Sequence, residues 1–151
     1  MVVFYFFSLI PIAVTVGVNS YINGFKLNEV VPVGNLELFL KSLFFAPWFE
    51  TLLLNVLLTK IFLVMKVRPI NIIGAVAFIF SCVHFSNGWY YPILIFIPAL
   101  MFQWNYFLYV EKDESAWGFL STTVLHFLYN FTIFVVIPLI SIVLNIYYGV
   151  G

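Results

Sequence analysis

Long apolar runs separated by short polar breaks dominate the pattern of positions along this chain. Most runs approach or exceed the roughly 20 residues that a helix needs to cross a bilayer. The expected spans cover about residues 2–18, 37 or 41 to 65, 70–85, 90–110 and 117–148. The last run exceeds one crossing, which predicts one long tilted helix or a span and a short helix hinged near Pro138. The pattern therefore predicts an all-α polytopic membrane protein, a bundle of about five transmembrane helices, or six if the last run holds two.

Prolines and polar turns indicate where these spans bend or end. Pro47 lies in the outer third of the second expected span, where it should bend or open the helix. Pro92 and Pro98 are expected to break the fourth span. Ser-Asn-Gly at residues 86–88 is a turn signal that closes the third span, and the charged residues 111–114 predict a solvated loop.

Composition supports the membrane interpretation, since 64% of the 151 residues are hydrophobic and 8% are charged. A soluble domain carries about 25% charged residues, so lipid is the solvent that suits this chain. We expect a single transmembrane domain over residues 1–151. The net charge of zero provides no basic surface for nucleic acid. The first twenty residues are apolar without a basic start or an Ala-x-Ala site, which predicts a retained span.

Basic residues suggest an orientation for a multi-pass protein of the cell membrane. Lys60, Lys66 and Arg68 gather around the junction of the second and third spans, which predicts a cytoplasmic loop there and a cytoplasmic N-terminus. Lys26 and Lys41 on the opposite side weaken this signal.

A few polar residues lie inside the expected spans, where a charge costs about 2.5–3.5 kcal/mol on insertion scales. Glu50 is the only acid well inside a span, and both histidines of the chain, His84 and His126, also fall within spans. Asn130 lies four residues after His126, so the two share one helix face. Such groups are expected to face the bundle interior, and the three ionisable ones to converge at one site.

These side chains supply the parts for hydrolysis of a peptide bond. A carboxylate can take a proton from water, while imidazole and amide donors can stabilise the oxyanion of a tetrahedral intermediate. Two histidines and one glutamate are also a ligand set for catalytic zinc, which is the metal alternative. A histidine bonded to a backbone carbonyl, or Asn130 as a hydrogen-bonding link between helices, is the structural alternative.

Three motifs in order resemble the CAAX-protease and bacteriocin-processing family of intramembrane proteases, also called type II CAAX prenyl endopeptidases. The family pattern is Glu-Glu-x-x-x-Arg, then Phe-x-x-x-His, then His-x-x-x-Asn/Asp. The matching segments are Pro-Trp-Phe-Glu-Thr-Leu-Leu-Leu-Asn at 47–55, Phe-Ser-Cys-Val-His at 80–84 and His-Phe-Leu-Tyr-Asn at 126–130. The resemblance covers about residues 40–135. Thr51 and Asn55 stand where the family has its second Glu and its Arg.

The resemblance implies a role for each matching residue. Glu50 would be the general base and His84 would help it to activate water. His126 and Asn130 would stabilise the oxyanion. We expect no metal cofactor, with zinc bound by Glu50, His84 and His126 as the alternative. A second Glu and the Arg are both absent, which is compatible with a divergent active enzyme or with an inactive relative.

The sequence therefore predicts an intramembrane endopeptidase that acts on a membrane-associated peptide within the lipid bilayer. The first alternative is a non-catalytic protein of the same fold, such as a bacteriocin-immunity or peptide-binding protein. The second is a proton-linked carrier that uses Glu50 and the histidines as a relay. The substrate and the oligomeric state do not follow from the sequence.

Overall fold

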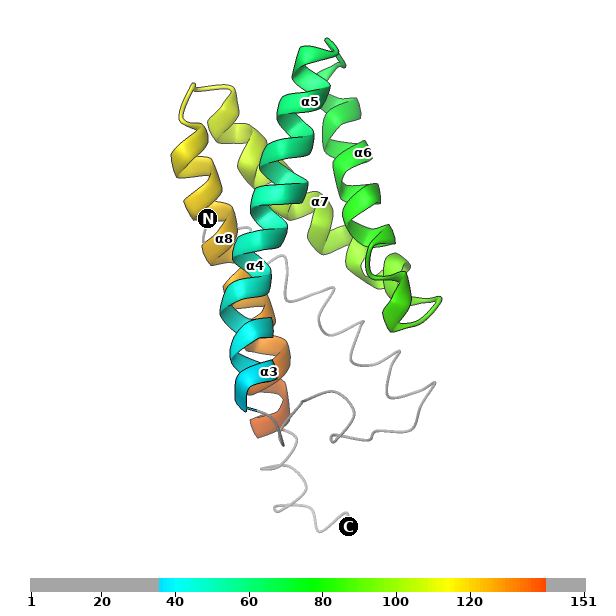
Figure 1. Cartoon of the computed structure of the whole chain (residues 1–151), viewed down its shortest axis with the longest axis vertical. Helices are drawn as coiled ribbons and strands as arrows, with labels where there is room; N and C mark the ends of the chain where they lie inside the picture. The colour runs from blue at the N-terminus through cyan, green and yellow to red at the C-terminus, as the bar shows by residue number, and fades with distance from the viewer. Residues whose placement is uncertain (1–35, 141–151) are drawn as a thin grey trace.

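The computed structural model describes residues 36–140, and every regular element within them is helical (Figure 1). Three helices are long and apolar enough to cross a membrane, Leu36–Val64, Tyr91–Val110 and Ser115–Ile140, and a shorter apolar helix spans Pro69–Cys82. The all-α membrane class is thus confirmed at the level of three candidate spans. The expected first span at residues 2–18 and the end of the last run, residues 141–148, lie outside the described residues.

Leu36–Val64 is one long rod built from alternating α and π turns. Its segments are α3 (Leu36–Leu40), the π-helix η1 (Lys41–Phe45), α4 (Ala46–Glu50), the π-helix η2 (Thr51–Leu57) and α5 (Leu58–Val64). Pro47 sits at the start of α4, directly after η1. A proline ring clashes with the carbonyl four residues before it, and a wider π turn relieves that clash. Pro47 therefore opens the helix next to Glu50, as the sequence indicates.

The prolines of the two later spans do not interrupt their helices, which corrects the expected breaks. α7 (Tyr91–Val110) is continuous, with Pro92 in its first turn and Pro98 buried inside it. A first-turn proline costs no intrahelical hydrogen bond. α8 (Ser115–Phe131) continues through the π-helix η4 (Thr132–Val136) to Ile140, so the described helix also passes Pro138 without a hinge.

α6 (Pro69–Cys82) is shorter than the expected third span, because it ends three residues before Phe85. Its 14 residues rise about 21 Å, against about 30 Å for the hydrocarbon core. A 3₁₀ turn, η3 (Phe85–Asn87), and Gly88 follow it. Gly88 has a φ of 137°, a backbone conformation that residues with a side chain rarely adopt. This glycine lets the chain reverse into α7.

The four helices pack as neighbours in chain order, and α8 returns against the long rod (Figure 1). The largest buried cluster joins α6, α7 and α8, and its members are Ala77, Phe80, Ala99, Phe102, Leu125 and Tyr129. α7 and α8 approach closely at Gly118, where an added Cβ would lie 2.9 Å from Cβ of Tyr109. Many large apolar side chains remain exposed on the outside, as lipid contact requires.

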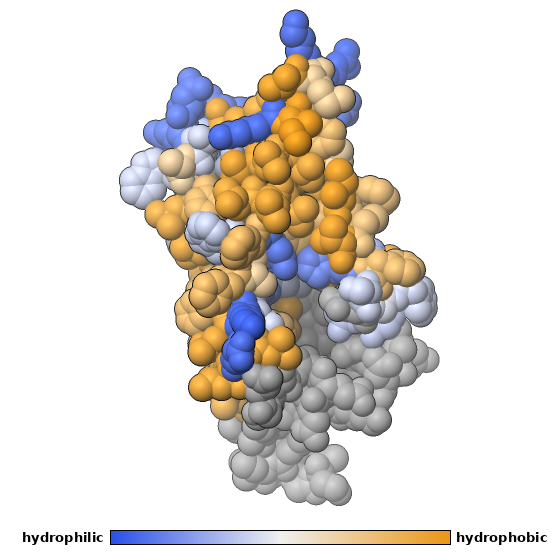
Figure 2. Space-filling model, in the orientation of Figure 1, coloured by the Kyte–Doolittle hydropathy of each residue, from blue (hydrophilic) through white to orange (hydrophobic). Residues whose placement is uncertain are grey.

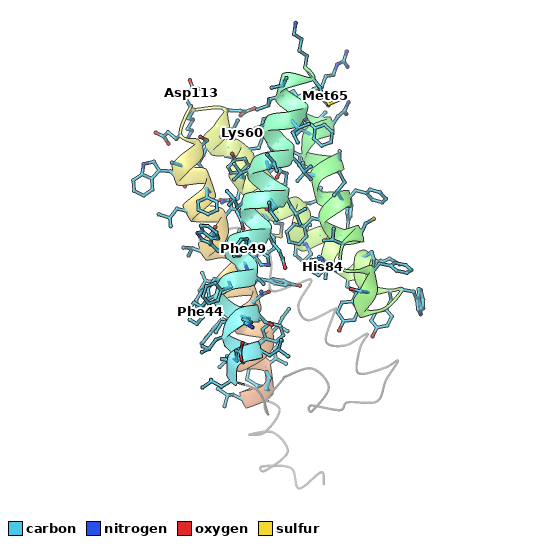
Figure 3. All side chains as sticks on the ribbon, viewed as in Figure 1. Phe44, Phe49, Lys60, Met65, His84 and Asp113 are labelled. Carbon is cyan, nitrogen blue, oxygen red and sulfur yellow. The ribbon has the colours of Figure 1, made fainter. Side chains whose placement is uncertain are left out.

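Charged residues mark one end of the described bundle. Hydrophilic side chains gather at the upper end in Figure 2, above a broad hydrophobic surface. Lys60, Met65 and Asp113 are labelled at that end in Figure 3, so the α5–α6 and α7–α8 connections lie on the same side. Residues 111–114 are all exposed, which confirms the expected loop.

Candidate functional site

Glu50, His84 and His126 come together from three different parts of the fold. Glu50 ends α4, His84 follows the C-terminus of α6, and His126 lies on α8. Oε2 of Glu50 is 3.8 Å from Nε2 of His84 and 3.5 Å from Nε2 of His126. Figure 3 shows His84 at the lower end of α6, beside the rod that carries Glu50. The structure thus produces the convergence that the sequence predicts.

The spacing of these three atoms suits a shared water molecule. Both distances exceed a direct hydrogen bond, which is about 2.7–3.2 Å long. Each is shorter than two hydrogen bonds in series, so a water lying beside the three atoms can bond to the carboxylate and to a ring nitrogen together. A water in that position is the geometry that a Glu base needs for proton transfer.

Phe80 fixes the orientation of His84. His84 lies outside the helix, contrary to the expected span over 70–85, yet its Nδ1 is 2.9 Å from the carbonyl oxygen of Phe80. A carbonyl oxygen only accepts, so Nδ1 carries the hydrogen and a neutral ring then presents the lone pair of Nε2 to Glu50. The Phe80 ring stacks on the imidazole with centroids 5.3 Å apart. This contact explains why a Phe-x-x-x-His spacing is useful here.

Aromatic packing holds His126 more tightly. The ring of Phe102 on α7 stacks on His126 with centroids 4.6 Å apart, and Phe80 lies 5.5 Å away on another side. The His126 side chain is 5% exposed, compared with 19% for His84 and 29% for Glu50. The site is therefore open on the side of Glu50 and His84 and closed behind His126.

The three groups lie deep within the apolar part of the bundle. Glu50 is 14 residues before Val64, about 21 Å along the rod, and His126 is 11 residues after Ser115, about 17 Å along α8. Val64 directly precedes Met65 and Ser115 lies two residues after Asp113, and Met65 and Asp113 are both at the charged end. A hydrocarbon core is about 30 Å thick, so both distances are shorter than the thickness that a candidate span would cross.

Comparison with family models, curated proteins and solved structures finds no match for this chain. The geometry of Glu50, His84 and His126 is therefore the main indication of its function.

Asn130 links α8 to the long rod. Its Nδ2 donates to the carbonyl oxygen of Ser42, 3.1 Å away, which uses one of its two N–H groups. This contact corresponds to the structural alternative for Asn130, the hydrogen-bonding link between helices.

Asn55, which stands at the family's Arg position, belongs to a buried hydrogen-bond network that the sequence reasoning missed. Its Nδ2 donates to Oε1 of Gln103 on α7 at 2.9 Å, and Nε2 of Gln103 donates to Oγ1 of Thr59 at 2.7 Å. All three side chains are buried. Gln103 is the only glutamine of the chain and lies within an apolar span, which is a signal that could have identified it.

A zinc site with Glu50, His84 and His126 as ligands is the alternative to a metal-free site. Ligands about 2.1 Å from a tetrahedral ion lie about 3.4 Å apart. The Glu50–His126 distance of 3.5 Å matches that spacing, whereas the Glu50–His84 distance of 3.8 Å is longer. No group of three or more His, Cys, Asp or Glu side chains within residues 36–140 has the arrangement of a metal site.

Proposed function

We propose that this chain is an intramembrane endopeptidase that hydrolyses a peptide bond of a membrane-associated peptide. The observation that carries the proposal is the approach of one Glu50 oxygen to Nε2 of both histidines, with Glu50 and His126 inside candidate membrane spans. An ionisable group in a membrane is costly, and three from separate elements at one point indicate a function. The resemblance to the CAAX-protease and bacteriocin-processing family agrees with this chemistry.

The proposed reaction begins with a water held beside Glu50. Glu50 takes one proton from this water while the oxygen adds to the carbonyl carbon of the scissile bond. Nε2 of His84 accepts a hydrogen bond from the same water and orients it. The carbonyl oxygen becomes an oxyanion, which donors from His126 and Asn130 stabilise. Collapse of the intermediate breaks the carbon–nitrogen bond, and the proton on Glu50 passes to the leaving amine.

The topology of the whole chain forms part of the proposal. We infer about five membrane spans with a cytoplasmic N-terminus in the cell membrane, the first span being residues 2–18. The open side of the site, at Glu50 and His84, would admit the substrate. Thr51 and Asn55 in place of the charged family residues are compatible with activity, because Asn55 forms an uncharged link to Gln103.

The test is cleavage of membrane peptides by purified protein in liposomes, with Glu50→Gln compared with wild type. We expect Glu50→Gln to lose cleavage because an amide cannot accept the proton. Glu37→Gln is the matched control, since Glu37 lies on the same rod, is exposed and pairs with Lys41. Equal cleavage by Glu50→Gln and wild type would contradict the proposal. Loss of wild-type cleavage with a chelator would instead support the zinc alternative.

A proton-linked carrier is the second candidate, and the Asn55–Gln103–Thr59 network favours it. This network extends the buried polar groups about two and a half helix turns beyond Glu50 towards the charged end. A carrier should move protons across liposomes in a Glu50-dependent way and leave peptides intact. Glu50-dependent cleavage without proton flux would exclude it. A non-catalytic peptide-binding protein should keep binding after Glu50→Gln.

A further inference from the structure

Buried polar atoms without a hydrogen-bond partner are concentrated at one helix interface. Among the described residues they are Oγ1 of Thr51, Oδ1 of Asn55, Oγ1 of Thr123 and Nδ1 of His126. Thr51 and Asn55 are on η2 of the long rod, while Thr123 and His126 are on α8. η2 and α8 pack against each other.

The residues that carry the four atoms lie within about one and a half helix turns of Glu50 or His126 along their own helices. The two helices run antiparallel, because Asn130 bonds to Ser42 and the Phe127 ring lies 5.1 Å from the Phe44 ring. Glu50 then meets His126 further along. Thr51 directly follows Glu50 and Thr123 lies about one turn before His126, so in antiparallel helices both lie on the same side of the Glu50–His126 contact.

The two threonines differ from other hydroxyl residues in the described helices. Ser81 donates to the carbonyl oxygen of Ala77 at 2.7 Å, and Thr132 donates to that of Leu128 at 2.8 Å. Such bonds to the preceding turn are the usual way to satisfy a hydroxyl in a helix. Oγ1 of Thr51 and of Thr123 have no such bond. Their hydroxyls therefore need a partner that residues 36–140 do not provide.

The chemistry of the four atoms fits water better than a cation. Leaving a buried polar atom unpaired costs free energy, and several together at one interface would be a large cost. Buried waters usually make about three hydrogen bonds to such groups. A hydroxyl both donates and accepts, Oδ1 of Asn55 accepts, and Nδ1 of His126 does either according to its tautomer. Water can satisfy this mixture, whereas a cation needs acceptors alone.

We propose that the interface between η2 and α8 holds a cluster of buried waters behind Glu50 and His126. We further propose that this cluster replaces the water consumed at each turnover, a role that rests on the proposed endopeptidase function. A site deep in the hydrocarbon has no bulk water beside it, so a local reserve keeps a nucleophile available. Thr51, Asn55 and Thr123 are then water-positioning residues.

The first test measures thermal unfolding of Thr51→Val and Thr123→Val, which replace the hydroxyl by a methyl group of similar volume. If waters bind the hydroxyls, each substitution should lower the melting temperature by about 2–4 °C. The double variant should then lose less than the sum, because the waters are shared. Thr122→Val is the control for a lost direct bond, since Oγ1 of Thr122 accepts from Asn105. An unchanged or raised melting temperature for Thr51→Val and Thr123→Val would overturn the water cluster.

Radiolytic hydroxyl labelling provides a second measurement that uses water itself as the probe. Radicals form from water at the site, so His126 should be labelled although its side chain is only 5% exposed. Labelling of His126 should fall several-fold in the Thr51→Val/Thr123→Val variant. An unlabelled His126, or equal labelling in both proteins, would also overturn the cluster.

Cleavage assays test whether the water cluster supplies water to the reaction, separately from whether the waters are present. If wild type cleaves peptides, the valine variants should cleave at least several-fold more slowly, and an unchanged rate would overturn the supply role. If wild type cleaves nothing, the proposed function and the supply role fail together. Thermal unfolding and labelling would still decide whether the waters are present.

Discussion

Replacing Gln103 by Leu tests the buried network that joins α7 to the long rod. The substitution removes two hydrogen bonds, from Asn55 at 2.9 Å and to Thr59 at 2.7 Å. It also leaves Nδ2 of Asn55 without the partner that Gln103 provides. Leu fits the apolar surroundings, so the change isolates the polar interactions.

The expected loss follows from these contacts. Hydrogen bonds between membrane helices contribute about 0.6 kcal/mol on average and about 1.7 kcal/mol at most. A buried donor left without a partner costs about 1–3 kcal/mol more. Gln103→Leu should therefore reduce the free energy of unfolding by about 2–4 kcal/mol. The double variant Asn55→Leu/Gln103→Leu removes both amides, so it should lose only about 0–1 kcal/mol.

The assay is reversible unfolding of the purified protein in mixed micelles, followed by helical circular dichroism as SDS is added. The decisive result is the order of stabilities, with the double variant above the Gln103→Leu single variant. The reasoning would be refuted if Gln103→Leu lay within about 0.5 kcal/mol of wild type, the range of neutral surface changes. A double variant less stable than Gln103→Leu would refute it as well.

Three further predictions concern packing and topology. Gly118→Leu should destabilise strongly, because even a Cβ there would lie 2.9 Å from Cβ of Tyr109, and a thermal melt should show no folded protein or a much lower midpoint. Asn130→Leu removes its bond to the long rod and should cost about 0.6–1.7 kcal/mol in SDS unfolding, and an unaltered midpoint would contradict this. In a Cys82→Ala background, Lys112→Cys should react with an impermeant maleimide from the cytoplasmic side only, and labelling from outside would reverse the proposed orientation.

The sequence predicted the long helices well because apolar length determines them. The rod ends at Val64 and α7 ends at Val110, within a residue of the expected limits. The sequence did not predict the end of α6, because apolar Val83 and Phe85 continue the hydrophobic run on either side of His84. The turn at Gly88, and not a change of hydropathy, marks where the chain reverses. Pro92 and Pro98 in α7 also led to a wrong prediction of helix breaks, because a packed helix tolerates them.

For the site, the sequence could identify residue types but not all of their partners. Glu50, His84 and His126 stand out because each is costly in lipid, and the structure places them together. Asn130 stands out for the same reason, yet its hydrogen bond is to the carbonyl oxygen of Ser42 and not to one of these three residues. The partner of Asn55 was not predictable, because Gln103 lies 48 residues away and the pairing depends on how α7 packs.

The central claim is that Glu50 and His126 act in one reaction, Glu50 as the base that activates water and His126 as a donor to the oxyanion. Its most direct test is the cleavage rate of Glu50→Gln, His126→Gln and the double variant in liposomes, with folding checked for each. Residues that act as a unit lose activity non-additively, so we expect the double variant to be no slower than the slower single variant. Rate losses that multiply in the double variant, or a wild-type rate for Glu50→Gln, would contradict the account.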